Sequence, residues 1–274
     1  MAKLLSVVVL ALALFAGPTS ASEVGGSQMY ADVAYLSQII GARPVGSVAG
    51  GRAADWIEQR FWSLGYDVER WEFSYDRDGQ TVHGTNLIAS VARPCTFVVG
   101  AHYDTKPNTV GANDNASGTA AMLDIADKAR GQFSPLNVCF VAFDGEDDGV
   151  RGSYAYAEAL GRDERRALRG MLSVDMVGVG DILAIKDDNL AMAERIVAAA
   201  EPLGIVTGPF WRRWRSDDTS FNDVGVSAGR ITWLDDPRKH TPEDTLVWIS
   251  PELLDTASRL VLAILQDVAT EPDV

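Results

Sequence analysis

Residues 98–118, with the sequence VVGAHYDTKPNTVGANDNASG, place an imidazole and several carboxylates close together in the chain. His102 is one of only three histidines among 274 residues, and Asp104 and Asp114 follow it closely. Imidazole nitrogen and carboxylate oxygen form a mixed ligand set that suits zinc, with cobalt or manganese as substitutes. The segment therefore indicates a metal-binding site.

Further residues of the same types follow other expected strands. Short apolar runs predict strands at residues 96–100, 138–143, 170–174 and 230–234. The acids and imidazoles that come after these four strands are His102 with Asp104, Glu146 with Asp147, Asp175, and His240. A histidine or an acid after one strand is ordinarily a turn or capping residue. Four coinciding strand ends instead favour one site beyond the carboxyl edge of a parallel sheet.

The remaining pattern predicts the layers around that sheet. Apolar residues recur at helical spacing in residues 29–40, 53–64, 118–129, 153–160, 190–203 and 253–268, and residues 67–75 and 85–92 have strand character. Alternating strands and helices indicate a mostly parallel, mixed central sheet with helices on both faces. We find no repeat and no long linker, so we expect a single three-layer α/β domain.

The charge of the chain limits its partners. Thirty-eight acidic residues against 24 basic ones give a formal charge of −14, which argues against nucleic acid or an anionic membrane as a partner. Clustered carboxylates on one sheet edge would also repel each other and raise one another's pKa. Bound divalent cations would remove that repulsion, because each adds two positive charges.

The first residues resemble a targeting segment. Lys3 precedes an apolar run over residues 4–16, and Thr19 and Ala21 fit the positions that signal peptidase reads. The run is shorter than the roughly 20 residues that a membrane-spanning helix needs. We expect a signal peptide at residues 1–21, a mature domain at 22–274 in a secreted or otherwise extracytoplasmic location, and no stable membrane association; an uncleaved anchor is the alternative.

If the chain is exported, its two cysteines enter an environment where a disulfide can form. Cys95 lies seven residues before His102, and Cys139 lies seven before Glu146. If the strands that contain or follow them are parallel neighbours, the two thiols lie at similar heights in the sheet. A disulfide and two buried free thiols both fit the sequence, since spacing supplies no geometry.

Several motifs together resemble a known family. HYD, GANDNASG, DGEDDGVRGS, SVDMVG and KHTPEDT occur in the order and approximate spacing of the co-catalytic di-zinc aminopeptidases, metallopeptidase family twenty-eight. GARPVGS, LGYDV and GTNLIA are similar to the family's amino-terminal blocks, and the similarity covers residue 29 to the end. The resemblance implies the zinc exopeptidase fold, two Zn²⁺ ions per chain and a peptide substrate.

The resemblance also implies a role for each matching residue. His102 and Asp175 would bind the first zinc, and Asp147 and His240 the second. Asp114 would bridge both ions, and the family often has a cis peptide after this residue. Asp104 would orient the ring of His102 from behind the metal, which fixes the tautomer and raises ligand basicity. Glu146 would be the general base that takes a proton from water activated by the cations.

Two positions depart from the family pattern. Asp147 stands where glutamate is common, so the neighbouring Asp148 could take over the ligand role or the second site could be weakened. Asp218 stands where a histidine is frequent, which affects the expected contacts to substrate.

Glu243 and Asp244 first suggest a helix start or cap. A basic, aromatic segment with Trp214 and Arg215 fits either a substrate pocket or a solvated loop.

We therefore expect a secreted zinc aminopeptidase that removes amino-terminal residues from peptides. A glutaminyl cyclase-like transferase that uses one zinc is the nearest alternative, since HYDTK, FDGED and ITW also resemble that class. A third alternative is a peptidase-like binding domain without turnover, against which the intact Glu146 and both histidines argue. The sequence indicates neither the preferred side chain nor the oligomeric state.

Overall fold

The computed structural model describes residues 21–210 and 214–272, with side chains from residue 28 onward. The expected signal peptide at residues 1–21 therefore lies almost wholly outside the described residues, and its cleavage stays a prediction. Residues 211–213, the first part of the basic, aromatic segment, also lie outside them.

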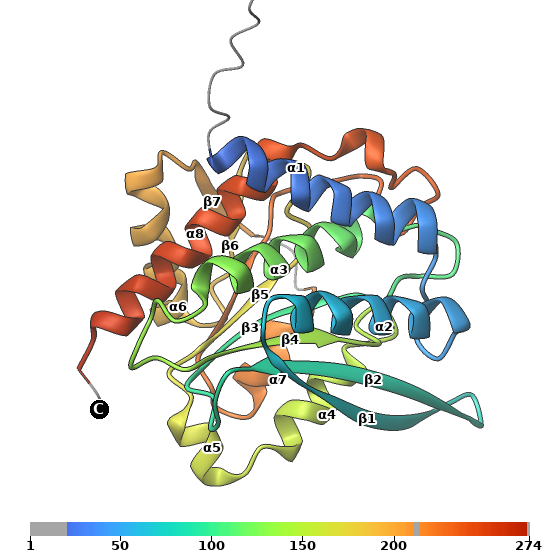
Figure 1. The fold of residues 1–274 in the computed structure, drawn as a ribbon, viewed down its shortest axis with the longest axis horizontal. Coiled ribbons are helices and arrows are strands. Elements are labelled where there is room, and N and C mark those ends of the chain that lie inside the picture. The colour runs from blue at the N-terminus through green and yellow to red at the C-terminus, as the bar shows by residue number, and fades with distance from the viewer. Residues whose placement is uncertain (1–20, 211–213, 273–274) are drawn as a thin grey trace, which may run out of the picture.

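A six-stranded mixed sheet forms the centre of the fold (Figure 1). Its strands, in spatial order, are β1 (Asp67–Arg77), β2 (Gln80–Ser90), β4 (Val138–Phe143), β3 (Phe97–His102), β5 (Met171–Val174) and β8 (Ala228–Ile231). The pairs β4–β3, β3–β5 and β5–β8 are parallel, whereas β1–β2 and β2–β4 are antiparallel. The prediction of a mostly parallel, mixed sheet is confirmed. The short strands β6 (Leu183–Ile185) and β7 (Thr207–Pro209) pair separately and were not predicted.

Helices cover both faces of the sheet, as predicted. One face carries the helices α1 (Ala21–Ala34), α2 (Val48–Ser63), α3 (Gly118–Ala129), α6 (Leu190–Ala200) and α8 (Pro251–Thr270), of which α1, α3 and α8 lie side by side in Figure 1. The opposite face carries the helices α4 (Arg151–Ala159), α5 (Arg162–Ala167) and α7 (Asp217–Asp223). Shorter helical turns lie at Tyr35–Ile40, Ala112–Ser117, Glu201–Leu203 and Leu246–Trp248.

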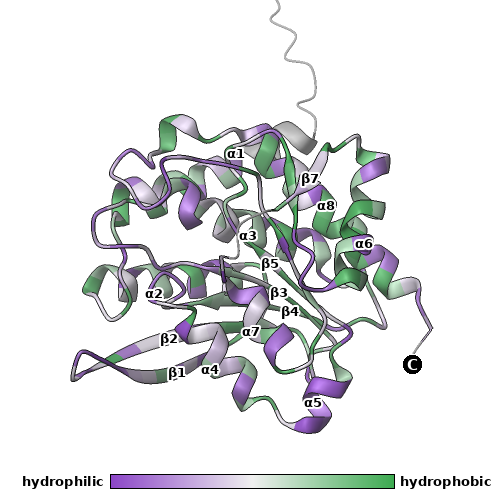
Figure 2. Cartoon of the chain, turned by 180° about the vertical axis from the view of Figure 1, so that it is seen from behind, coloured by the Kyte–Doolittle hydropathy of each residue, from purple (hydrophilic) through white to green (hydrophobic). Residues whose placement is uncertain are grey.

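The central strands are apolar because both of their faces are covered. All six residues of β3 and of β4 are buried, and Figure 2 shows these strands in hydrophobic colours beside a hydrophilic α5. Successive residues point to opposite faces, so Val99 joins the core under α3 and α8 while Val98 packs toward Phe221 of α7. This sandwich holds the carboxyl ends of the parallel strands at one edge.

Several boundaries differ from the sequence-based expectation, among them those of β1, β2 and β8. The strands expected at 67–75 and 85–92 are longer and form a single hairpin, because Asp78 and Gly79, with φ of 54° and 80°, make a tight turn. The strand expected at 230–234 begins earlier, at Ala228, because its parallel pairing with β5 runs from Met171↔Ala228 to Val174↔Ile231. Trp233 instead makes an isolated bridge to Leu183.

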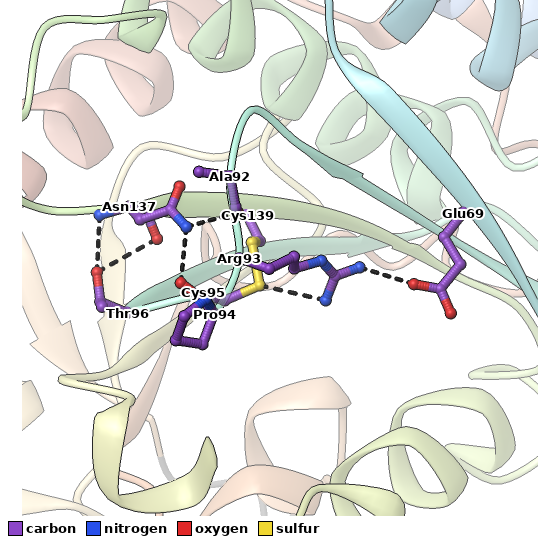
Figure 3. Close-up of a disulfide and its surroundings, with 8 residues drawn as sticks. All are labelled: Glu69, Ala92, Arg93, Pro94, Cys95, Thr96, Asn137 and Cys139. Atoms are coloured by element: carbon purple, nitrogen blue, oxygen red, sulfur yellow. Dashed lines mark hydrogen bonds and ion pairs between the residues drawn. A yellow bond between two sulfur atoms is a disulfide. The ribbon is translucent and has the colours of Figure 1, made fainter. Parts of the chain in front are cut away.

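The cysteines form a disulfide between β4 and the segment that enters β3 (Figure 3). Cys139 is paired in the sheet with Val98, and the Cα atoms of Cys95 and Cys139 lie 5.6 Å apart. The parallel strand pairing thus resolves the choice that the sequence left open. Arg93 beside the bridge donates to Cys95 Sγ and pairs with Glu69 of β1.

Candidate metal centre

The sheet brings the expected ligands to one edge. His102 is the last residue of β3, Asp175 directly follows β5, and Asp147 lies in the loop after β4. His240 comes from the loop after β8, and Asp114 lies in the segment Ala112–Ser117 that leads into α3. Distant parts of the chain therefore meet where the strand-end argument expected them to meet.

The ligands form two groups that share Asp114. In the first group, His102 Nε2 lies 3.3 Å from Asp114 Oδ1 and 3.5 Å from Asp175 Oδ1. In the second group, His240 Nε2 lies 3.1 Å from Asp114 Oδ2 and 2.6 Å from Asp147 Oδ1. Each group offers three ligand atoms within 4.8 Å of one another. The two oxygens of Asp114 thus face different groups, as a bridging carboxylate requires.

The ligand atoms fit a pair of cations because protein hydrogen bonds leave them unsatisfied. The buried atoms without a hydrogen-bond partner include His102 Nε2, both carboxylate oxygens of Asp114 and of Asp147, Asp175 Oδ1, and His240 Nε2. Burying polar atoms without partners is costly, and native proteins leave few of them. Divalent ions would satisfy the whole set, and its mixed nitrogen and oxygen donors suit zinc.

The motif GANDNASG fixes Asp114 relative to Asp175. Asn115 donates from Nδ2 to the carbonyl of Val174 and accepts from the amide of Met176, so it holds the backbone on both sides of Asp175. Gly118 packs against Val174, where an added Cβ would come within 2.1 Å of the carbonyl oxygen. The peptide bond between Asp114 and Asn115 is cis, as the family resemblance implied.

Asp104 connects the histidine to the acid pair. Its Oδ1 lies 3.4 Å from His102 Nδ1, which places it behind the ring as expected. Both of its oxygens also accept backbone hydrogen bonds, from the amide of Glu146 at 2.9 Å and from the amide of Asp147 at 3.1 Å. One carboxylate therefore joins His102 at the end of β3 to the loop that follows β4.

The acid that joins the second group is Asp147. The carboxylate of the neighbouring Asp148 bonds instead to the hydroxyl of Tyr75 and, at 3.2 Å, to Arg77 on the β1–β2 hairpin. The fold therefore places Asp147 at the site, and Asp148 does not take over its position.

Asp244 has a role that differs from the expected helix cap. Its carboxylate is buried and accepts from the amides of Asn113 at 2.7 Å and Asp114 at 2.9 Å, across a long sequence separation. Burial raises the pKa of Asp244 to about 6, while these two amides oppose the shift. A helical turn begins at Leu246, but Asp244 does not cap it, because its carboxylate instead holds the backbone of Asn113 and Asp114.

Arg43 is a second residue that the sequence did not single out. It is fully buried, and its guanidinium donates hydrogen bonds to five backbone carbonyls. These carbonyls belong to Leu36, Gly41, Tyr103, Val110 and Gly111. Burial lowers the pKa of Arg43 to about 10, although Asp104 and Asp244 oppose the shift. GARPVGS was noted only as similar to an amino-terminal block of the family, and spacing gives no sign of this contact.

A cavity of about 770 Å³ opens beside the ligands. Glu146, Asp147, Asp175 and His240 line it, together with the aromatic side chains of Phe210, Trp214 and Trp233. Trp214 and Arg215 of the basic, aromatic segment line this cavity and are also exposed to solvent, so both interpretations of the segment fit the structure.

Arg230 also lines this cavity and explains the departure at Asp218. The buried carboxylate of Asp218 accepts from Arg230 Nη2 at 2.7 Å and lies 3.2 Å from Lys186 Nζ. A histidine at position 218 could not neutralise these two cations. The unusual acid is therefore matched by basic neighbours.

Glu146 stands between the first group and the cavity. Its Oε2 lies 3.8 Å from His102 Nε2, and its side chain keeps a small exposed fraction. Burial raises the pKa of Glu146 well above the usual glutamate range, with His102 opposing and Asp175 adding to the shift. The adjacent carboxylates of Asp114 and Asp147 raise the pKa of His240 to about 9. Both shifts have the same electrostatic meaning, which is that this carboxylate-rich site favours bound positive charge.

The fold and the paired clusters together define the class, an α/β metallopeptidase with ligands at the carboxyl edge of its sheet. The model of Peptidase family M28 matches residues 86–265, more than half of the chain, and the chain therefore belongs to this family. Aminopeptidase YwaD of Bacillus subtilis (strain 168) is 30% identical over 201 residues, which cover 69% of this chain and 44% of that protein. The chain spans about half the length of the curated relatives it matches.

Solved structures show the same fold. BSAP, a zinc aminopeptidase from Bacillus subtilis, matches with a TM-score of 0.80 and 20% identity, over 88% of this chain and 94% of that chain. Glutaminyl cyclase from Bacteroides thetaiotaomicron, bound to N-acetylhistamine, also matches with a TM-score of 0.80, at 19% identity over 88% and 97% of the two chains. The expected zinc exopeptidase fold is thereby confirmed.

Among the described residues, no helix combines the length and the apolar character needed to cross a bilayer.

Proposed function

We propose that this chain is a zinc-dependent aminopeptidase that hydrolyses the first peptide bond of its substrates. The observation that carries the proposal is the sharing of Asp114 between two groups of three ligands, with Glu146 beside them at the cavity. Membership in Peptidase family M28 supports a hydrolytic reaction on peptides.

Each proposed residue has a distinct task. His102, Asp114 and Asp175 would hold one zinc, and Asp114, Asp147 and His240 the other. When bound, such ions polarise a carbonyl and make a water molecule more acidic. Glu146 would accept the proton of the attacking water and return it to the leaving amine. Asp104 would hold the ring of His102 and the backbone of Glu146 in fixed positions relative to each other.

The cavity would receive the amino-terminal residue of the peptide. Its aromatic walls suit the apolar part of a side chain, and the carboxylates of Glu146, Asp147 and Asp175 provide negative charge for an α-ammonium group. A free amino terminus would then be required, because an acylated one carries no charge for these carboxylates to attract.

A glutaminyl cyclase-like activity is the second candidate. The fold match to the Bacteroides thetaiotaomicron cyclase is as good as the match to BSAP by TM-score. Our preference for the peptidase rests on the second ligand group of Asp147 and His240, because a single-zinc transferase has no use for two complete groups that share a bridging carboxylate.

Secretion is part of the proposal. The expected signal peptide at residues 1–21 and the disulfide between Cys95 and Cys139 both suit an oxidising, extracytoplasmic location. Mass spectrometry of the chain recovered from the medium or periplasm would measure both features. Recovery from the cytosol with an intact amino terminus and free thiols would contradict the location.

One experiment separates the activities. The purified mature chain would be tested by elemental analysis and then assayed on amino-acyl amide chromophores, on their acetylated forms and on a glutaminyl peptide. The peptidase predicts two zinc ions per chain and chromophore release from free amino termini only. Ammonia release from the glutaminyl peptide with one zinc per chain would favour the cyclase. Binding of substrates with no reaction in either assay would favour a domain without turnover.

A further inference from the structure

A lysine ammonium lies against the oxygen that the second ion needs. Lys239 Nζ is 3.5 Å from Asp114 Oδ2, the same oxygen that lies 3.1 Å from His240 Nε2. The side chain is mostly buried at 18% exposure, lines the cavity, and has its Nζ 5.4 Å from the centre of the Trp214 ring. This cation is therefore built into the site and is not a mobile surface charge.

The loop that carries Lys239 is fastened to the metal-binding segments. Asp236 accepts from Asn113 Nδ2 at 3.0 Å, and Asn108 donates to the carbonyl of His240 at 3.1 Å. His240 has a left-handed backbone with φ of 61°, which orients successive side chains of this loop. Because both ends of the loop are held, the backbone that presents Lys239 and His240 has a fixed position relative to Asp114.

The two ligand groups differ in their surroundings. In the first group, His102, Asp114 and Asp175 are all at most 2% exposed, and Asp114 meets His102 through Oδ1, away from the oxygen that Lys239 contacts. In the second group, the His240 side chain is 38% exposed and Asp147 replaces the longer glutamate. The ammonium of Lys239 touches the oxygen of Asp114 that faces this second, more open group, although its charge also reaches Asp175 and Glu146.

We propose that Lys239 makes the two metal sites unequal, by competing for Asp114 Oδ2 and repelling a divalent ion in the Asp147–His240 group. The first ion is then held tightly and the second is exchangeable, so activity depends on the free metal concentration. This inference rests on the proposed metallopeptidase function, since it concerns the same ligands. It assigns to Lys239 a role in setting metal occupancy.

The test measures metal binding in the absence of substrate. Chain stripped of metal with a chelator would be titrated with Co²⁺ and with Zn²⁺ against a chromophoric competitor, which resolves two binding steps and, for Co²⁺, their visible spectra. In the parent chain the second step is weaker than the first. In Lys239→Met, which removes the charge but keeps an unbranched chain, the second step tightens by about tenfold or more, the size expected for losing one nearby like charge.

Two further variants separate charge from other effects. Lys239→Arg keeps the charge, so its second step stays weak. Lys128→Met removes a lysine that pairs with Asp124 in the last turn of α3, so it changes the net charge equally and leaves both steps unchanged. The first step serves in every variant as an internal check of folding.

The outcomes are distinct for the inference and for the proposed function. An unchanged or weakened second step in Lys239→Met, or an equal change in both steps, would overturn the inference. Two unequal steps in the parent, with the expected response of Lys239→Met but no peptide hydrolysis, would support the inference and reject the aminopeptidase. A chain that binds no divalent ion at either group would overturn both.

Discussion

Asp104 accepts a hydrogen bond from the backbone amide of Glu146 at 2.9 Å, and the same oxygen lies 3.4 Å from His102 Nδ1. The loop after β3 and the loop after β4 are thereby held to each other by one buried carboxylate. The proposed general base and the proposed ligand of the first ion share this support, so neither is positioned by its own loop alone.

Asp104→Asn should weaken binding of the first metal ion. The amide keeps the size of the side chain but has only one acceptor oxygen, so at least one of its three contacts is lost. We expect metal affinity or kcat/KM to fall by about 10- to 100-fold, as with other residues that support metal ligands. Metal titration and peptide hydrolysis measure the two effects. Asp55→Asn on the exposed face of α2 is a control, and an equal response of both variants would remove Asp104 from this role.

Glu146→Gln should abolish most turnover without releasing metal. The amide cannot accept the proton of the attacking water, and general base catalysis contributes about 10²- to 10⁴-fold. We expect kcat to fall by that factor while elemental analysis gives the parent metal content. Full activity in Glu146→Gln would exclude this glutamate as the base, and loss of metal would instead make it a ligand.

The positions of these site residues were predictable because sheet geometry is a simple rule. Continuous apolar runs such as VCFVAF identified central strands, and polar residues directly after them had to reach one edge. Asp147 and His240 lie in longer loops, so the strand rule brought them only to this edge, and the family resemblance supplied their expected role in the second group. Their meeting at Asp114 depends on how the two loops are folded.

Arg43 and Asp244 were missed for a physical reason. Each acts through backbone groups of residues far away in the sequence, and a backbone carbonyl or amide has no signature in residue type. The contacts of Asp148 with Tyr75 and Arg77 were missed for another reason, because the pairing of β1 with β2 into one long hairpin was not predicted. The Asp-Gly turn at residues 78–79 was a signal that could have corrected it.

Metal-free chain should lose stability as pH rises from 6 to 9. The folded pKa of His240, about 9, exceeds its unfolded value of 6.5, so the stability it adds below pH 6.5 is lost as pH rises through 9. Burial raises the pKa of Asp217 to about 7 and that of Asp144 to about 8, so ionising them also destabilises the fold over this range. In the unfolded chain the two carboxyl groups ionise near pH 3.8, so above that pH the folded state binds more protons than the unfolded state. The two carboxyl groups and His240 therefore all lower the free energy of unfolding as pH rises.

Zinc should reverse this trend, because metal binding displaces the proton of His240 and grows stronger with pH. Thermal unfolding at pH 6, 7, 8 and 9, with a chelator and with excess zinc, measures both curves. A melting temperature of the metal-free chain that rises between pH 6 and pH 9 would contradict the assignment of these buried protons.

Arg43→Met should destabilise the fold strongly. The methionine leaves several buried carbonyls without a donor, and each unsatisfied buried group costs about 1–3 kcal/mol. We expect the free energy of unfolding to fall by about 3 kcal/mol or more in urea titrations. Arg52→Met on the exposed surface of α2 should change it by no more than about 0.5 kcal/mol. Similar values for the two variants would show that the carbonyl contacts of Arg43 contribute little.

Replacing both cysteines by serine should lower stability while sparing the active site. The bridge closes a sequence separation of 44 residues, for which loop entropy gives about 4 kcal/mol. Cys139 is in β4, but at its amino half, whereas Asp147 follows the carboxyl end of that strand. We therefore expect the unfolding free energy of Cys95→Ser/Cys139→Ser to fall by about 2–4 kcal/mol, with kcat/KM of the folded fraction unchanged at low temperature. A stability equal to that of the parent would mean that the strand pairing alone holds this end of the sheet, and a lower kcat/KM would mean that the bridge acts on the site through β4.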